Sequence, residues 1–272
     1  MNKIGIRGHD IGKMSAAELA KKIKDFGFDG VQLVFKKALI TQVDFSDIHS
    51  IKSAFNGLDI PLLGAYFNPI QPNLEERNEG ISYFKKNLKI AQALGASFVG
   101  SETGFSTIGS AENIEAIHNK ATLSQVTEVF RDLVLTAKTY NSYVAIEGAY
   151  AHVAYDPFSI KYIVDQINSP HLKVIVDLYN FLNINNYQDR MEIFETSLSL
   201  LKNDIVIFHL KDFIVENGKL KQVGLGQGLM DYETIIHRIC ETTPDAYLIL
   251  EGVTGLDINP SLALIKKLLE RK

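Results

Sequence analysis

Hydrophobic positions along this chain follow two alternating patterns. Short, almost uninterrupted apolar runs rich in β-branched residues are typical of strands buried on both faces of a parallel sheet. Between them lie longer segments in which apolar residues recur every three or four positions, as in a helix with one buried face. The apolar runs predict strands at residues 3–7, 30–34, 61–66, 97–102, 143–147, 172–177, 205–209 and 246–251.

Several of the intervening helices carry capping residues at their ends. Ser15 and Glu18 have the spacing of a capping box, which opens a helix that continues to Phe26. Gly95 can adopt the left-handed conformation that ends the helix at 74–94, and Asp156 with the following proline opens another. The remaining helices are expected at residues 44–56, 120–140, 187–202 and 231–241 and after Asn259 and Pro260.

Each predicted strand is followed by a helix, so the chain contains eight strand–helix pairs in one series. Neighbouring parallel strands need helical crossovers, which are right-handed, and eight such units close a sheet into a (βα)8 TIM barrel. No proline-rich linker, low-complexity tract or change of composition marks a boundary. We therefore expect one α/β domain spanning residues 1–272, with a doubly wound open sheet as the alternative.

Composition narrows the class of partner. The 272 residues are 46% hydrophobic, enough for a large core, and the net charge of −4 gives no overall field that would attract nucleic acid or anionic lipid. A single cysteine, Cys240, excludes an intrachain disulfide, and no apolar stretch approaches the ~18 residues of a membrane span. The sequence also lacks a basic and apolar leader. We expect a cytoplasmic protein that binds a small molecule.

Four consecutive strands end on a residue that can bind a divalent metal, namely Glu147, Asp177, His209 and Glu251. In a barrel these strand ends are neighbours at the C-terminal rim, where barrel enzymes carry their active sites. Three carboxylates and an imidazole suit Mn²⁺, Mg²⁺, Co²⁺ or Zn²⁺. Like charges at short range are unfavourable, and one divalent cation would resolve that conflict. Taken singly, each residue could instead form rim hydrogen bonds or ion pairs.

The motifs around these residues resemble a known family. Glu147 lies in Ile-Glu-Gly, Asp177 in Val-Asp-Leu-Tyr-Asn, His209 in His-Leu-Lys-Asp and Glu251 in Leu-Glu-Gly, and a glycine-rich run extends over residues 224–231. This pattern is similar to the xylose isomerase-like TIM barrel superfamily, and within it to the sugar phosphate isomerase/epimerase group. The resemblance implies that the four residues bind one divalent ion.

The same resemblance implies a reaction. In this group a divalent ion chelates a carbonyl and a neighbouring hydroxyl, and so stabilises the enediolate formed when the adjacent proton is removed. Glu147 and Glu251 would be the carboxylates that take and return the proton. We therefore expect an isomerase or epimerase of a sugar, sugar phosphate or related polyol. An inosose dehydratase-like lyase is the alternative, because dehydration begins with the same proton abstraction.

Further residues at the rim are candidates for binding this carbohydrate substrate. Asn180 stands where many relatives have a histidine, and it can form hydrogen bonds but does not titrate near neutrality. Lys211 follows His209 by two positions and can share its orientation. The other half of the rim contributes the candidates Arg7, Tyr66 and Glu102, together with His9, Gln32 and Asn68.

Two other functions are weaker matches. An endonuclease IV-like DNA repair enzyme needs several additional histidines for three zinc ions, and these are missing here. A catalytically silent sugar-binding barrel would not need the complete metal-binding quartet. The loop with Gly224, Gly226 and Gly228 lacks the spacing of a dinucleotide fingerprint, although a contact with a substrate phosphate remains open. Barrels of this group often pair, so a homo-oligomer is possible.

Overall fold

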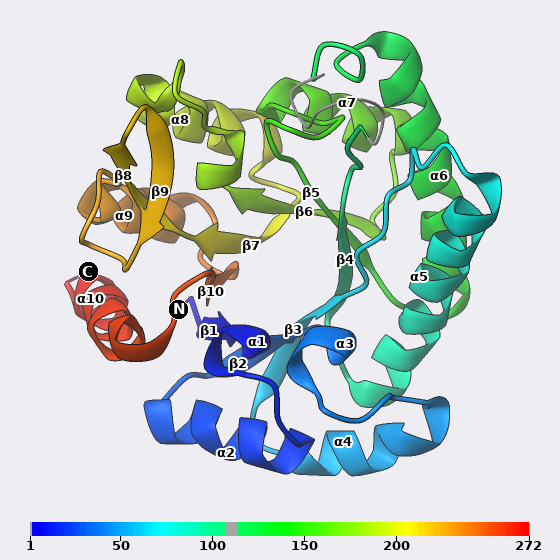
Figure 1. Ribbon diagram of the computed structural model, residues 1–272, viewed down its shortest axis with the longest axis horizontal. Helices are drawn as coiled ribbons and strands as arrows, with labels where there is room; N and C mark the ends of the chain where they lie inside the picture. Colours follow the sequence, from blue (N-terminus) through cyan, green and yellow to red (C-terminus); the bar gives the residue numbers. More distant parts are fainter. Residues whose placement is uncertain (1, 107–113, 272) are drawn as a thin grey trace.

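The strands form a closed parallel barrel in a computed structural model that describes residues 2–106 and 114–271 (Figure 1). Neighbouring strands follow the order β1-β10-β7-β6-β5-β4-β3-β2 around the barrel. The predicted (βα)8 barrel is therefore confirmed, and the open-sheet alternative is wrong. The barrel strands are β1 Ile4–Arg7, β2 Gly30–Leu33, β3 Asp59–Gly64, β4 Phe98–Glu102, β5 Val144–Glu147, β6 Leu172–Asp177, β7 Ile205–Leu210 and β10 Tyr247–Leu250.

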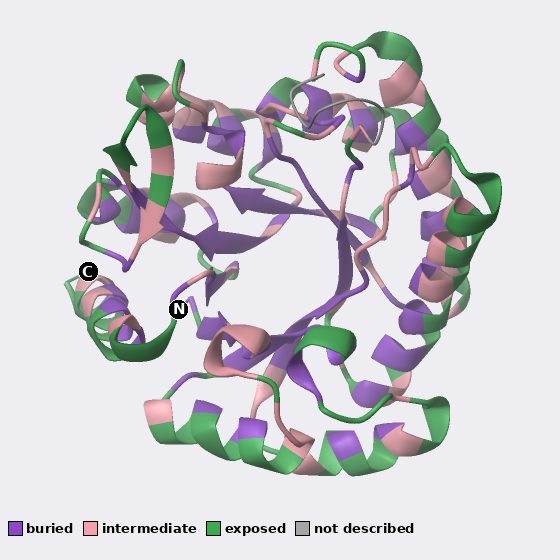
Figure 2. Ribbon diagram, in the orientation of Figure 1, coloured by how far each residue is buried: buried purple, intermediate pink, exposed green. Residues whose placement is uncertain are grey.

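Helices surround the barrel, and no helix among the described residues is long and apolar enough to cross a membrane. Figure 2 shows that their inner faces are buried against the strands and their outer faces are exposed. The main helices are α2 Ala16–Phe26, α4 Ile48–Ala54, α5 Leu74–Leu94, α6 Lys120–Thr139, α7 Pro157–Ile167, α8 Arg190–Leu201, α9 Tyr232–Thr242 and α10 Ile258–Glu270. Short helices α1 Gly8–Ile11 and α3 Phe35–Ala38 follow β1 and β2, and 3-10 turns occur at Phe45–Asp47, Tyr179–Phe181, Tyr187–Asp189 and Gly255–Asp257.

The predicted caps are present at three helices, and one helix start is misplaced. Ser15 and Glu18 form the capping box of α2, Gly95 ends α5 with a φ of 84°, and Asp156 caps α7. The last helix begins at Ile258 and not at Asn259 and Pro260, because a 3-10 turn leads directly into it. Proline is tolerated there, since the first helical turn has no internal acceptor for its missing N–H.

The register of the strands brings the polar strand ends to one level. Glu102 pairs with Glu147, and Asp177 pairs with His209. Two residues before each member of the metal-binding quartet lies an apolar residue, and alternation along a strand points both side chains to the same face. These residues, together with Leu62, form a fully buried cluster inside the barrel: Ala145, Ile175, Ile207 and Ile249. The polar rim therefore rests on an apolar layer.

An antiparallel hairpin follows β7 where the sequence analysis predicted only a glycine-containing loop. Its strands are β8 Asp212–Glu216 and β9 Lys219–Val223. The turn residues Asn217 and Gly218 have φ values of 51° and 71°. An Asn-Gly pair with positive φ at both positions is the preferred two-residue hairpin turn, so the signal was present in the sequence.

One buried carboxylate, that of Asp212, fastens the hairpin to the glycine-rich loop. Asp212 is completely buried, and its Oδ2 accepts hydrogen bonds from the amides of Gly226 and Gly228 at 2.9 and 3.0 Å. Its Oδ1 accepts from the amides of Phe213 and Met230 at 2.8 and 3.0 Å. The two glycine amides are thus used inside the protein, which argues against the phosphate contact that the sequence left open.

We expect Asp212→Asn to destabilise the fold by about 2–3 kcal/mol, because the amide group would face N–H donors that now meet a charged acceptor. Urea denaturation monitored by circular dichroism measures this loss. Asp231→Asn is the matched control: Asp231 caps α9 from an exposed position, and asparagine caps a helix equally well. Equal stability of the two variants would contradict a special role for Asp212.

Candidate metal centre

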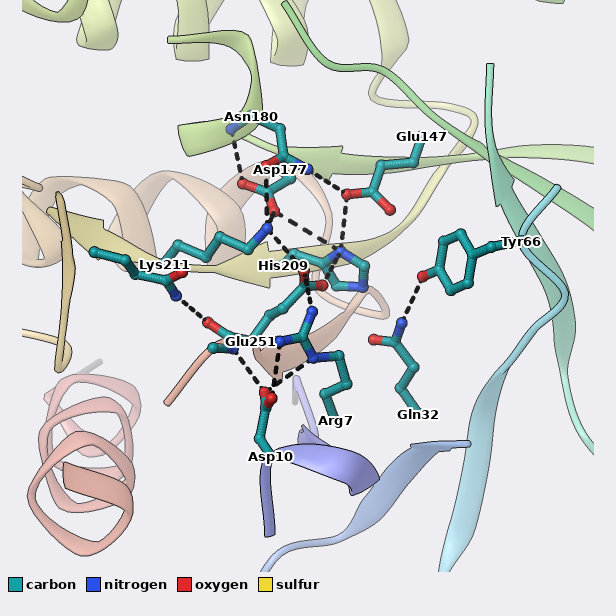
Figure 3. Close-up of polar contacts among 12 residues, drawn as sticks. Arg7, Asp10, Gln32, Tyr66, Glu147, Asp177, Asn180, His209, Lys211 and Glu251 are labelled. Carbon is teal, nitrogen blue, oxygen red and sulfur yellow. Dashed lines mark hydrogen bonds and ion pairs between the residues drawn. The ribbon is translucent and has the colours of Figure 1, made fainter. Parts of the chain in front are cut away.

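The four strand-ending residues of the quartet meet at the mouth of the barrel (Figure 3). Glu147 and Asp177 are the last residues of β5 and β6, His209 lies near the end of β7, and Glu251 follows β10. One candidate ligand atom from each lies within 4.8 Å of all the others. The exposed fractions of Glu147, Asp177, His209 and Glu251 are only 2%, 0%, 3% and 7%. The structure thus brings together the residues that the sequence predicted would converge.

His209 is at the centre of this quartet. Its Nδ1 lies 2.9 Å from Glu251 Oε2, 3.2 Å from Glu147 Oε1 and 3.9 Å from Asp177 Oδ2. Burial alone would lower the pKa of His209, but the carboxylates of Glu147 and Glu251 outweigh it and raise the pKa to about 10. A protonated imidazole offsets part of the negative charge, and it would release this proton on binding a cation, because a metal ligand must be the neutral imidazole.

Lys211 and Arg7 supply further positive charge. Lys211 Nζ lies 2.7 Å from Asp177 Oδ2 and 2.7 Å from Glu251 Oε1, and Arg7 Nη1 lies 2.7 Å from the same Glu251 oxygen. Burial would lower the pKa of Lys211, yet the neighbouring carboxylates raise it above its usual value. Three side chains therefore share the charge balance that the sequence argument assigned to a metal alone.

The donor atoms of the quartet fit a divalent cation. Ligand oxygens and nitrogens lie ~2.0–2.6 Å from such ions, so two ligands on opposite sides of one ion are at most ~5 Å apart. The separations in the quartet meet this condition. Asp177 Oδ2 is buried and accepts no hydrogen bond among the described residues, although it forms the ion pair with Lys211. This oxygen therefore retains a lone pair for a cation.

Asn180 connects the ligand carboxylates with Lys211. Its Nδ2 donates to Glu147 Oε1 at 2.8 Å, its Oδ1 accepts from Lys211 Nζ at 3.0 Å, and its backbone amide donates to Asp177 Oδ1 at 3.1 Å. These three bonds fix the orientation of the amide group. Asn180 lies in the site as the sequence predicted, and it also positions Glu147.

Arg7 is held toward Glu251 by a residue that the sequence analysis missed. Asp10 in α1 accepts from Arg7 Nε at 3.0 Å and from Nη2 at 2.8 Å, a two-pronged pair that fixes the plane of the guanidinium. The other bond of Asp10, from the amide of Gly252 at 2.6 Å, ties this pair to the segment after β10. No periodic pattern in the sequence indicates α1, so the spacing of Arg7 and Asp10 carried no signal.

The opposite half of the mouth presents Tyr66 and Glu102. The Tyr66 hydroxyl accepts from Gln32 Nε2 at 2.7 Å and points toward the quartet (Figure 3). Burial, together with Glu147, holds the pKa of Tyr66 well above its usual value, so the hydroxyl stays protonated and can donate. Burial and the nearby Glu251 also raise the pKa of Glu102.

Two other rim candidates differ in their placement. Asn68 is used structurally: its side chain bonds to the carbonyl and the amide of Phe105 at 2.9 and 3.3 Å. His9 lies beside Arg7, and its buried Nδ1 has no hydrogen-bond partner among the described residues. Burial and the positive charge of Arg7 lower the pKa of His9 to about 4. His9 is therefore a neutral imidazole at the rim.

Comparisons with known proteins agree with this architecture. A search of curated protein sequences returned no match. Among solved structures, a D-tagatose 3-epimerase-like protein is 18% identical, with a TM-score of 0.75 and coverage of 99% of this chain and 97% of that one. The 3-keto-D-glucoside 4-epimerase YcjR from E. coli is 17% identical, with a TM-score of 0.74 and coverage of 98% and 100%.

A third similar structure is the IOLI protein with a bound zinc atom, which is 17% identical, with a TM-score of 0.76 and coverage of 99% of this chain and 97% of that one. At such identities the likeness concerns the fold. The family described as "Xylose isomerase-like TIM barrel" matches the sequence over residues 20–270, which is most of the chain. This protein therefore belongs to the xylose isomerase-like TIM barrel family.

Proposed function

We propose that this protein is a divalent-metal-dependent isomerase or epimerase that acts on a sugar, a sugar phosphate or a related polyol. The observation that carries the proposal is the buried quartet of Glu147, Asp177, His209 and Glu251 at the C-terminal ends of four neighbouring strands. Similarly folded proteins that include sugar epimerases support the same class of reaction.

The quartet would hold one ion, with Mn²⁺, Mg²⁺, Co²⁺ and Zn²⁺ all compatible with its oxygen-rich donors. When bound, such an ion polarises a substrate carbonyl and reduces the cost of the negative charge that develops as the adjacent proton leaves. Asp177 and His209 serve only as ligands in this proposal. Glu147 and Glu251 act both as ligands and as groups that move a proton.

The positions of the two glutamates suit a proton transfer from two sides. Glu147 ends β5 and Glu251 follows β10, and these strands flank β6 and β7 in the barrel. One carboxylate removes the proton next to the carbonyl, and the other returns a proton from the opposite side, which inverts the carbon. The apolar layer formed by Ala145, Ile175, Ile207 and Ile249 excludes water beneath the reacting groups.

The remaining polar residues of the mouth would bind the substrate. Lys211 and the protonated hydroxyl of Tyr66 are donors for substrate oxygens, and Arg7 lies beside Glu251. Asn180 and Glu102 line the cavity next to the quartet and can contact hydroxyl groups. Five residues from both halves of the rim thus surround the space above the proposed metal site.

A dehydratase-like lyase is the second candidate. Elimination of water needs a group that protonates the departing hydroxyl, and the Lys211 ammonium lies 2.7 Å from an oxygen of Glu251. The endonuclease-like alternative is not supported, because the quartet with its single histidine is the one such cluster in the described part of the chain. Cytoplasmic location and homo-oligomer formation stay predictions.

Metal binding should be stoichiometric and stabilising. We expect one Mn²⁺ per chain after dialysis, and at ~100 times the Kd it should add about 2.7 kcal/mol to the free energy of unfolding. Asp177→Asn removes a ligand charge and should weaken binding at least ~10-fold. Metal analysis and calorimetry measure both effects. Glu216→Gln, which alters an exposed carboxylate of the hairpin, is the control. A chain that takes up no divalent ion would rule out the proposed enzyme.

Glu251→Gln should abolish exchange of the substrate's α-proton with solvent, a loss of ~100-fold or more, while the fold is kept. Incorporation of deuterium from D2O with Mn²⁺, across ketoses, sugar phosphates and inososes, provides the assay. Glu102→Gln alters a carboxylate in the same mouth but outside the quartet, and should raise KM while exchange at saturating substrate continues. Exchange that persists in Glu251→Gln removes Glu251 from proton transfer.

A further inference from the structure

A side cavity of about 460 Å³ opens next to the quartet, and of its lining residues the proposed function uses only Asn180 and Glu102. Asn180, which donates to Glu147 Oε1 at 2.8 Å, and Glu102, which pairs with Glu147, both line it, so the cavity adjoins the quartet. Its outer walls come from three segments: the loop after β5, the segment after β6 and the β8–β9 hairpin. They contribute Tyr150 and His152, then Tyr179, Leu182 and Ile184, and finally Leu220.

The outer walls are mostly apolar, and Asn183 and Lys219 are the polar residues among them. Tyr150, Tyr179 and His152 present rings, and Leu182, Ile184 and Leu220 present aliphatic side chains. Hydroxyl groups placed against such walls would lose hydrogen bonds to water without replacing them. A free sugar held at the quartet would leave these walls exposed to solvent, whereas an apolar ring would cover them.

The walls are braced before any ligand binds. Tyr179 lines the cavity, its ring centroid lies 5.8 Å from Lys211 Nζ, and its ring packs against that of Phe213 with a centroid distance of 5.8 Å. The amide of Tyr150 donates to the carbonyl of Asn180 at 2.6 Å, and its ring meets the His118 ring edge to face. A preformed wall keeps the entropic cost of binding low.

We infer that the natural substrate carries an apolar, planar substituent, such as an aryl group in glycosidic linkage, which occupies this side cavity while the carbohydrate, with its reacting carbonyl at a carbon other than the anomeric one, lies at the quartet. The inference deepens the proposed function and rests on it for the placement of the carbohydrate. The size of the cavity agrees, since pockets for drug-sized ligands usually measure ~300–1,000 Å³. Flat rings also suit the edge and face contacts that aromatic walls offer.

Binding of paired glycosides to the full chain with Mn²⁺ tests this inference. The probes are the methyl and p-nitrophenyl glycosides of glucose, galactose and xylose, which have no carbonyl and therefore report binding alone. Cellobiose and lactose are the probes that carry a second sugar, and isothermal titration calorimetry is the measurement. We expect the p-nitrophenyl glycoside of at least one sugar to bind tenfold or more tightly than its methyl counterpart.

Two variants test whether the preference for the aryl glycoside arises in the cavity. Ala151→Trp fills the mouth of the cavity from an exposed loop position, and Ile184→Ser removes an apolar wall. Both should reduce the aryl preference to less than threefold. Val215→Ser is the matched control, because Val215 on the hairpin is 39% exposed, against 40% for Ile184, and does not line the cavity. Circular dichroism verifies that each variant folds.

Equal affinity for methyl and aryl glycosides of every sugar overturns the inference, as does tighter binding of a disaccharide or an aryl preference that survives Ala151→Trp. The binding test of the side cavity and the deuterium-exchange test of the proposed reaction can fail independently. An aryl preference without deuterium exchange on any substrate would keep the side cavity and remove the isomerase. Exchange on sugars without an aryl preference would do the reverse.

Discussion

Burial of three carboxylates at one point is the constraint on which the rest of the site depends. Glu147, Asp177 and Glu251 are almost completely inaccessible to water, and like charges at this range are unfavourable unless positive charge is brought equally close. The chain meets part of this need itself, through His209, Lys211 and Arg7. Arg7 lies in β1, His209 lies in β7 and Lys211 directly follows β7, so β1, β10 and β7 must be paired before the charges balance. Assembly of the site therefore depends on the pairing of β1 with β10, which joins the two ends of the chain.

The two-residue alternation of the strands separates stability from chemistry. One inward layer is apolar and fully buried, and the next layer toward the rim carries the quartet. Ile207 and His209 illustrate the division, since they point to the same side of β7 one layer apart. The apolar layer can contribute hydrophobic stabilisation without approaching the substrate. It also keeps water away from the quartet on the side that faces the barrel interior. Electrostatic interactions among the charged side chains of the quartet are therefore stronger than they would be in water.

The sequence predicted the barrel and the quartet because both follow from local patterns: apolar runs define strands, and their last residues define the rim. It did not predict Asp10, the partner of Arg7, because that contact depends on a short helix without a periodic signal. The four amides around Asp212 come from residues 1 to 18 positions away and could not be read from spacing. The Asn217-Gly218 turn, in contrast, was readable and was overlooked, since the following glycines favoured a loop.

Within the proposed reaction, the two glutamates of the quartet are not equivalent. Lys211 and Arg7 both contact Glu251 Oε1. Glu147 Oε1 contacts His209 and the neutral side-chain amide of Asn180. Burial alone would raise the pKa of Glu251, but His209, Lys211 and Arg7 hold it well below its usual range. Glu251 is therefore ionised, as a proton acceptor must be, but its charge is strongly offset. The difference between the two residues lies in the cations around them and not in their positions on the strands, and Asp10 contributes to it indirectly by fixing Arg7. A division of labour between two chemically identical side chains thus follows from the residues that neutralise them.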